Sequence, residues 1–245
     1  NDGKFAAFML NEEADKLISL KSDINALFNS PVLGYNSKDD IVYQFWANRD
    51  SHEVYYFDPK TDYAPTTAIS SISWDDPNFP NIEGFGVWAA KCNFTMGPDG
   101  KMYSRMLGGN LVRIDVENAR GENLTNGDLV GTKDGSAYGL VFDPQDENVF
   151  YFSNNDKHCI YKYDLRTKEC ACWAGQEGKS GYLDGPIGQA MFNKPGQMCV
   201  DSEGNIILTD TENHCIRKIT MSTGYVSTLA GKPQNSGYVN GSAED

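Results

Sequence analysis

The sequence has no long apolar run, few cysteines and an excess of acidic over basic residues. No stretch approaches the ~20 apolar residues of a membrane-spanning helix. Six cysteines among 245 residues, without a C-x-x-C pair, are too sparse for a disulfide scaffold and disfavour a zinc or thioredoxin-like site. Lys and Arg number 21 against 34 Asp and Glu, a net charge of −13. This charge repels phosphate backbones and anionic lipids, so we expect no nucleic-acid partner and no membrane-spanning segment.

Signatures of several common catalytic and binding sites are also missing. The segments GPDGK (97–101) and DSEGN (201–205) lack the acid spacing of an EF-hand and the Lys-Ser/Thr of a P-loop, so we interpret them as hairpin turns. No serine lies in a G-x-S-x-G elbow. We therefore assign no catalytic residue, no metal ligand and no cofactor, with calcium as the alternative left open.

What the sequence does contain is an internal repeat. A shift of 56 residues places NDKHCIYKYD (155–164) over TENHCIRKIT (211–220), and it also aligns GYLDG (181–185) with GYVNG (237–241). An earlier copy, 28–43 followed by 52–61, aligns once small insertions are allowed, and 95–115 is a more divergent copy. Self-similarity at a fixed period indicates a repeat architecture.

Each repeat has the pattern of four short strands. Runs of four to six residues rich in Val, Ile, Tyr and Thr alternate with Gly, Asn and Asp turns, which is typical of an antiparallel meander. Four strands repeated about every 50 residues predict an all-β fold, a β-propeller of four-stranded antiparallel blades. Only 12–20 has any helical pattern, and its place in the repeat favours a strand.

The recurring histidines are candidates either for chemistry or for architecture. His52, His158 and His214 occupy the same place in three copies. Because an imidazole can both donate and accept, it suits unpaired backbone groups in a polar loop. We therefore interpret His52, His158, Asn213 and His214 as structural repeat residues. We expect His214 to be buried with its ring bonded to backbone, and His158 and His52 to repeat that geometry.

The cysteines leave two interpretations open. Cys172 could face Cys159 across a hairpin, because DLRT (164–167) would turn the chain back between them. Buried free thiols are the alternative.

Residues 192–231 closely resemble an NHL repeat, a family named for an Asn-His-Leu-like triplet. Asn213-His214 occupies that signature, with Cys215 where the third residue varies. The segment 181–195 is similar to the linker of secreted Bacteroidetes-type surface lipoproteins, in which the propeller often follows an IPT/TIG domain. The resemblance implies a complete propeller of six blades, of which this chain would cover about five, and an extracytoplasmic location in the periplasm or at the cell surface.

On this basis we expect one propeller segment over 1–245. It would hold a partial blade at 1–20, blades at about 21–69, 70–130, 131–175 and 187–231, and the start of another at 237–245. The expected partners are a glycan or protein ligand and the rest of the same chain, namely a missing blade and a TIG domain.

The resemblance implies two classes of function. NHL-like propellers include binding platforms and also calcium-assisted lyases or lactonases, whose metal ligands converge on the axis, where the innermost strands of this sequence offer few donors. Aromatic residues in non-consensus insertions instead favour a non-enzymatic extracellular or surface propeller that binds a glycan or a protein, with packing between blades as the alternative use of the rings. The candidate ligand-binding residues are Trp46, Arg49, Trp74, Phe85, Trp88, Arg105, Tyr138, Asn154 and Asp210.

Overall fold

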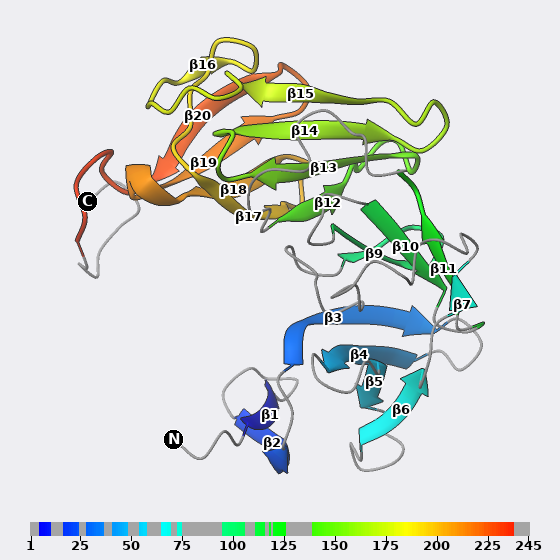
Figure 1. Ribbon diagram of the computed structural model, residues 1–245. Coiled ribbons are helices and arrows are strands. Elements are labelled where there is room, and N and C mark those ends of the chain that lie inside the picture. Colours follow the sequence, from blue (N-terminus) through cyan, green and yellow to red (C-terminus); the bar gives the residue numbers. More distant parts are fainter. Residues whose placement is uncertain are drawn as a thin grey trace. The chain divides into compact units, whose positions relative to one another are not determined.

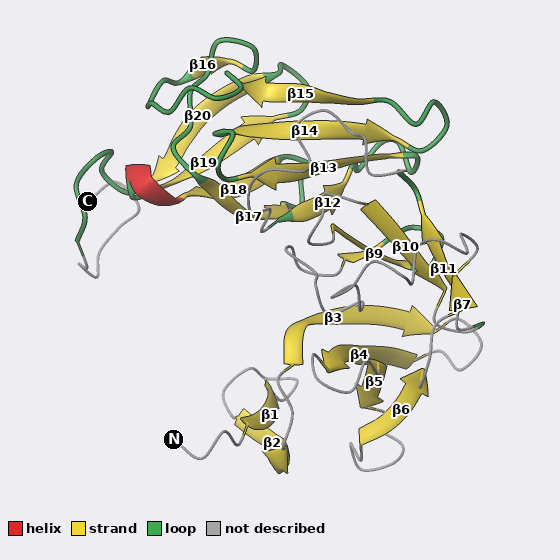
Figure 2. Ribbon diagram, viewed as in Figure 1, coloured by secondary structure: helices red, strands yellow, loops and turns green. Residues whose placement is uncertain are grey.

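The computed structural model describes 95–105, 111–115, 118, 120–125 and 139–237 with their side chains, and the backbone alone of strands β1 to β7. These earlier strands are β1 (Phe5–Leu10), β2 (Leu17–Ile24), β3 (Phe28–Asn36), β4 (Ile41–Asn48), β5 (Val54–Phe57), β6 (Pro65–Ile69) and β7 (Ser73–Trp74). The only helical element in the described part is a 3-10 helix at Thr211–Asn213, drawn red in Figure 2. Within the same residues, no helix has the length and apolar character needed to cross a membrane.

The strands pair in chain order into antiparallel sheets. β1 pairs with β2, and β3 to β6 form a four-stranded sheet. The next sheet contains β8 (Thr95–Met96), β9 (Met102–Arg105), β10 (Leu111–Asp115) and β11 (Arg120–Asn123), with β7 added in parallel to β11. The all-β class and the four-stranded antiparallel sheets are thus confirmed, and 17–20, at the end of the helix-like stretch, belongs to strand β2.

Two further sheets follow in the second half of the chain. One contains β12 (Leu140–Phe142), β13 (Val149–Asn154), β14 (Cys159–Asp164) and β15 (Cys170–Gly175). The other contains β17 (Pro195–Val200), β18 (Ile206–Asp210), β19 (Cys215–Thr220) and β20 (Tyr225–Ala230), with β16 (Gly185–Pro186) on the β20 edge. The chain divides into two compact units, 1–106 with 112–123 and 107–111 with 124–245.

The sheets β12–β15 and β16–β20, which lie next to each other in Figure 1, share one hydrophobic core. Every residue of β13 is buried, whereas β19 alternates between buried and half-buried positions. The sheet β12–β15 therefore has β13 covered on both faces, whereas β19 buries one face and leaves the other partly exposed. The shared core contains Val141, Val149, Tyr151, Ile160, Ala174, Ala190, Phe192, Ile206, Leu208, Ile219 and Val226.

The 56-residue repeat extends to backbone conformation. His158 and His214 are both left-handed, with φ of 55° and 57°, and Gly175 and Gly231 have φ of 94° and 88°. The β14–β15 and β19–β20 pairings shift register at the same place, after Ile160 and after Ile216. The repeat therefore encodes the loops and bulges as well as the strands.

Gly139 packs directly against strand β17 of the neighbouring sheet. A Cβ atom added there would lie 2.6 Å from the backbone nitrogen of Met198 and 2.9 Å from the carbonyl oxygen of Gly196, both in β17. These backbone atoms cannot move aside without moving the strand. Close contact between the sheets thus requires glycine at this position.

We predict that Gly139→Ala lowers the free energy of unfolding by about 1–3 kcal/mol, because the added methyl group forces β17 away from the neighbouring sheet. Gly188→Ala is the matched control, since a Cβ atom there would meet nothing within 4 Å. Urea denaturation of both variants checks this, and equal stability of the two would contradict the packing argument.

Candidate functional site

The loop that joins β18 to β19 is organised by a buried arginine. Arg217 is fully buried. Its Nη1 donates to Asp210 Oδ2 at 2.6 Å, and its Nη2 donates to Asp184 Oδ1 at 2.6 Å and to the carbonyl oxygen of Leu183 at 2.9 Å. A bond of 3.1 Å from Nη1 to the carbonyl oxygen of Met191 completes the set. One guanidinium group thereby ties the 183–191 segment to the sheet.

Two aromatic rings flank the same guanidinium group. Its central carbon lies 4.8 Å from the centre of the Tyr182 ring and 5.2 Å from that of Phe192, distances suited to cation–π contact. Phe192 is itself part of the core between the two sheets. Arg217 therefore couples the 181–195 segment to the packing of both sheets.

Both carboxylate oxygens of Asp210 accept hydrogen bonds from the protein, which is typical of a carboxylate with a structural role. Besides Arg217, it accepts from Asn213 Nδ2 at 2.8 Å and from the backbone N–H of Asn193 at 2.7 Å. Burial raises the pKa of Asp210 above its usual range, and the bonds from Asn213, Asn193 and Arg217 oppose that rise. Asn213 also donates to the carbonyl oxygen of Gly181, so it fixes the start of the same segment.

The two repeat histidines share a backbone conformation but not an environment. His158 is half-buried, and its Nδ1 accepts from the backbone N–H of Lys194 at 3.1 Å. His214 is exposed, so the expected burial of this residue is wrong. The difference lies in the partner: the segment that contains Lys194 packs against His158 and covers part of its ring.

A cavity of roughly 430 Å³ opens beside this loop. Backbone bonds from Thr211 and Glu212 to the carbonyl oxygens of Lys194 and Asn193 hold its walls together. Gly196 lets the wall close, since a Cβ atom there would lie 2.5 Å from Thr209 Oγ1. The lining offers amides, hydroxyls and one ion pair, Lys194 with Glu212 at 3.6 Å. The lining residues are Asn155, Lys194, Gly196, Gln197, Thr209, Thr211 and Glu212.

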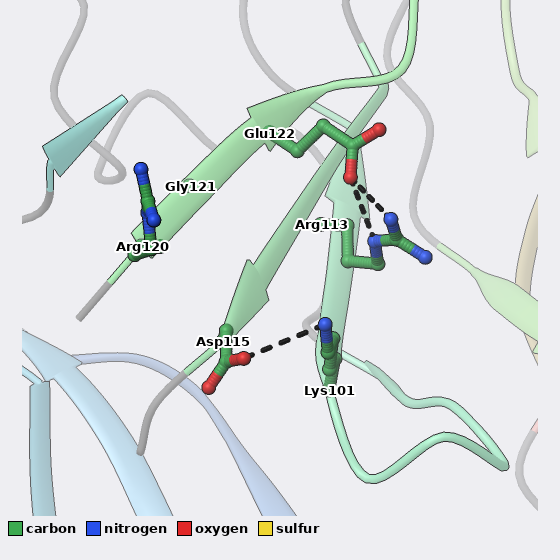
Figure 3. Close-up of a pocket in the computed structure, with 6 residues that line it drawn as sticks. All are labelled: Lys101, Arg113, Asp115, Arg120, Gly121 and Glu122. Carbon is green, nitrogen blue, oxygen red and sulfur yellow. Dashed lines mark hydrogen bonds and ion pairs between the residues drawn. The ribbon is translucent and has the colours of Figure 1, made fainter. Parts of the chain in front are cut away.

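A second, smaller pocket of roughly 170 Å³ lies on the sheet that contains β9, β10 and β11 (Figure 3). Its charges pair with one another: Lys101 lies 3.4 Å from Asp115, and Arg113 bonds to Glu122. Arg120 and Gly121 complete the lining. Two of the three cationic side chains in the lining are thus paired with acidic residues of the same pocket. Among the described residues, no group of three or more His, Cys, Asp or Glu side chains could hold a metal ion.

The sequence-predicted ligand residues fall in different places. Arg105, Asn154 and Asp210 are buried, and Asn154 Oδ1 accepts from the backbone N–H of Lys157 at 3.2 Å. Trp46 pairs with Tyr55 in the β4–β5 register, and Trp74 pairs with Gly121 in the β7–β11 register. Arg49, His52, Phe85, Trp88 and Tyr138 lie outside the described residues.

Sequence reasoning missed both Arg217 and the cavity. A signal for Arg217 was present, because it alternates with Cys215 and Ile219 on one face of a strand and replaces Tyr161 of the previous repeat. No comparable signal marks the cavity, whose lining comes from segments that only the fold brings together. Asn155 and Thr211 are an exception, since they occupy the same position in successive repeats.

Comparison with known proteins points to one repeat family. The family model of the NHL repeat matches residues 192–219. The bovine NHL repeat-containing protein 2 (Bos taurus) is 30% identical over 112 residues, a match that covers 39% of this chain and 15% of the bovine chain.

Solved structures share the fold over most of this chain. A structural genomics protein from Bacteroides thetaiotaomicron VPI-5482 matches with a TM-score of 0.68, 20% identity and coverage of 96% of this chain and 57% of its own. An auxiliary nutrient binding protein from Bacteroides ovatus ATCC 8483 matches with a TM-score of 0.65 and 18% identity, and the match covers 92% of this chain and 52% of that protein. Virginiamycin B lyase from Staphylococcus aureus matches with a TM-score of 0.55 and 12% identity, and the match covers 94% of this chain and 64% of the lyase. The chain therefore spans less than two thirds of each of these structures, and the likeness concerns the fold.

We predict that Arg217→Met lowers the free energy of unfolding by about 3–5 kcal/mol, because the carboxylate of Asp210 stays buried without its cation. Adding Asp210→Asn to this variant should restore part of the loss, since the second change removes the orphaned charge. Arg166→Met is the matched control: Arg166 bonds Asp146 and Asp164 in an exposed pair, where solvent screens the attraction. Urea denaturation measures the free energy of unfolding of the three variants. Equal losses of stability in Arg217→Met and Arg166→Met would contradict the argument that burial makes the Arg217 interactions more important for stability.

The bond between His158 and Lys194 predicts a pH dependence of stability. Burial, aided by the charge of Lys194, lowers the pKa of His158 below its ordinary value of 6.5. The unfolded chain therefore takes up the proton first as pH falls, so this contribution to stability is present above about pH 6.5 and is lost below it. In His158→Ala we expect the free energy of unfolding to fall by about 1 kcal/mol at neutral pH and to depend less on pH below 6.5.

His214→Ala serves as the control for that experiment. Because His214 is exposed, its replacement should change the neutral-pH stability by less than about 0.5 kcal/mol. Thermal unfolding followed by circular dichroism at several pH values measures both variants. Equal destabilisation at neutral pH would show that the contact with Lys194 adds nothing.

Proposed function

Since this chain is an NHL-repeat protein with propeller-like similarity to Bacteroides proteins, we propose that it is a non-enzymatic propeller that binds a neutral oligosaccharide. The observation that carries the proposal is the cavity beside the β18–β19 loop, lined by amides and hydroxyls. Sugar hydroxyls both donate and accept hydrogen bonds, and amide and hydroxyl side chains do the same. The Lys194–Glu212 pair adds no net charge, which fits a neutral ligand.

The propeller itself is part of the proposal. Successive four-stranded sheets with a shared core are what adjacent blades require, and β12 and β17 would be innermost strands. We propose six blades in the complete arrangement, with blades of this chain at about 21–69, 70–130, 131–175 and 187–231 and partial units at 1–20 and 237–245. The rest of the propeller and a TIG domain would belong to the same protein.

A periplasmic or cell-surface location belongs to the same proposal. It is supported by the similarity to an auxiliary nutrient binding protein of Bacteroides ovatus. An oligosaccharide ligand fits that location, because a surface nutrient binder meets polymers of the medium before any transporter does.

The aromatic residues of the insertions are proposed as an alternative contact surface for a glycan. Trp46, Trp74 and Trp88 could stack on the C–H faces of sugar rings while polar groups take the hydroxyls. Arg49, Phe85, Arg105 and Tyr138 stay in the proposal as candidate ligand-binding residues. Asn154 and Asp210 would hold the residues that follow them, Asn155 and Thr211, in the cavity lining.

We predict that a screen of neutral oligosaccharides on a glycan array identifies a ligand, and that Asn155→Ala and Thr211→Ala each weaken its binding by about tenfold, the effect of one lost hydrogen bond. Isothermal titration calorimetry measures the affinities. Lys101→Ala in the charge-paired pocket should bind as the unmodified protein does. If both cavity variants keep full affinity while Trp74→Ala and Trp88→Ala lose it, the aromatic surface is the site and the cavity is not.

The alternative proposal, a calcium-assisted lyase or lactonase, is tested with the same material. Incubation of the bound oligosaccharide and of model lactones with the protein and calcium, followed by mass spectrometry, would reveal a change of substrate mass or new chain ends. Unchanged substrates are expected for a binding protein. Turnover that requires calcium would overturn the non-enzymatic assignment.

A further inference from the structure

Two cysteines share one face of the hairpin formed by β14 and β15. In the register of this hairpin Cys159 is opposite Gly175, and Cys172 is opposite Tyr161, two positions further along β14. Residues two apart in a strand point to the same face, so the side chains of Cys159 and Cys172 lie on one side of the sheet. The register shift between Ile160 and Tyr161 offsets the two strands at this point.

The two thiols lie close enough for each to shift the pKa of the other. Cys172 Sγ donates to the carbonyl oxygen of Gly175 at 3.8 Å. Gly175 also packs closely against Cys159, since a Cβ atom added to it would lie 3.2 Å from Cys159 Cα. Gly175, at the end of β15, therefore lies beside both cysteine residues.

The two thiols differ in exposure and in acidity. Cys159 is fully buried, whereas Cys172 is half-buried and can be reached from solvent. Interaction with Cys159 lowers the pKa of Cys172, and interaction with Cys172, together with burial, raises the pKa of Cys159. The accessible sulfur is thus also the better nucleophile at neutral pH.

We propose that Cys159 and Cys172 form a redox-active dithiol that closes to a disulfide between β14 and β15. The oxidant is a small-molecule disulfide. The Cys172 thiolate attacks one sulfur of that molecule, forms a mixed disulfide and releases one small thiol. Cys159 then loses its proton to solvent and attacks the Cys172 sulfur, which releases the second small thiol. Two protein thiols are oxidised and one small-molecule disulfide is reduced, so two electrons are transferred.

The neighbouring repeat provides an internal control. Cys215 occupies the place of Cys159, and Thr228 occupies the place of Cys172, opposite Arg217 in the β19–β20 register. Gly231 lies over Cys215 as Gly175 lies over Cys159. The backbone is the same, but the second thiol is missing, and the Thr228 hydroxyl bonds to Asp184 instead. Cys215 should therefore form no intrachain disulfide.

The test uses the whole chain, reduced and then incubated with oxidised glutathione. Free thiols are alkylated after acid quenching, and proteolytic peptides are analysed by mass spectrometry. We expect one cross-linked species that joins Cys159 to Cys172, with both thiols lost together, and a thermal midpoint several degrees higher in the oxidised protein. A stable glutathione adduct on Cys172, or a link from Cys172 to Cys170, which lies two residues away on the same strand, would overturn the proposal.

Two variants check the order of attack. Cys159→Ser should trap glutathione on Cys172, because the resolving thiol is gone, and Cys172→Ser should leave Cys159 reduced. Cys215→Ser is the matched control and should form the Cys159–Cys172 link as the unmodified chain does. If a variant does not fold, the cross-link in the unmodified chain still decides the proposal. A glutathione adduct on Cys159 in Cys172→Ser would show that Cys159 is not the shielded partner.

Discussion

The guanidinium group of Arg217, buried between the carboxylates of Asp210 and Asp184, is the constraint on which the second half of the chain depends. Removing charged groups from water is costly, and attraction offsets that cost only when further hydrogen bonds form. Here the carbonyl groups of Leu183 and Met191 accept two further guanidinium protons, so Nη1 and Nη2 are each bonded twice, whereas the buried Nε has no hydrogen-bond partner. As a consequence, the segment between the two sheets is held so that Phe192 enters their common core and Lys194 reaches the cavity.

The repeat sets the backbone, and the neighbouring segment decides what each side chain does. His158 and His214 have the same left-handed conformation, and Gly178 and Gln234 close the following turn with equivalent backbone bonds, to Lys157 and to Asn213. Yet only His158 meets a backbone donor, because the segment that contains Lys194 packs over it. Similarly, Tyr161 and Arg217 occupy one repeat position, but the Tyr161 ring stacks on Phe152, whereas Arg217 bonds to Asp210 and Asp184. A conserved conformation therefore does not imply a shared contact.

The sequence predicts the features that the repeat encodes locally, but not the contacts that depend on other segments. Strands such as β19 alternate in burial, and alternation is local information, so the all-β class and the four-stranded sheets could be predicted. The placement of Cys172 and Cys159 on one face of a hairpin was open to the same reasoning, because a short turn fixes the register of a hairpin. The contact of His158 with Lys194 and the cavity could not be predicted, since both depend on segments tens of residues away in sequence. Arg217 is intermediate: its place on the buried face was readable, but its partners were not.

The cavity also explains why a binding site in a repeat fold leaves little trace as a motif. Asn155 and Thr211 are the first residues of the same loop in successive repeats, directly after Asn154 and Asp210, and both line the cavity. The alignment that places 52–61 on 158–167 puts Arg49 at this position in an earlier copy. The preceding residue is buried and bonded, so it holds the loop, and the next residue is free to vary in chemistry. Sequence self-comparison detects the holding residues because they recur. The residues that would contact a ligand are the ones that differ between copies, and their shared position, not their identity, marks the site.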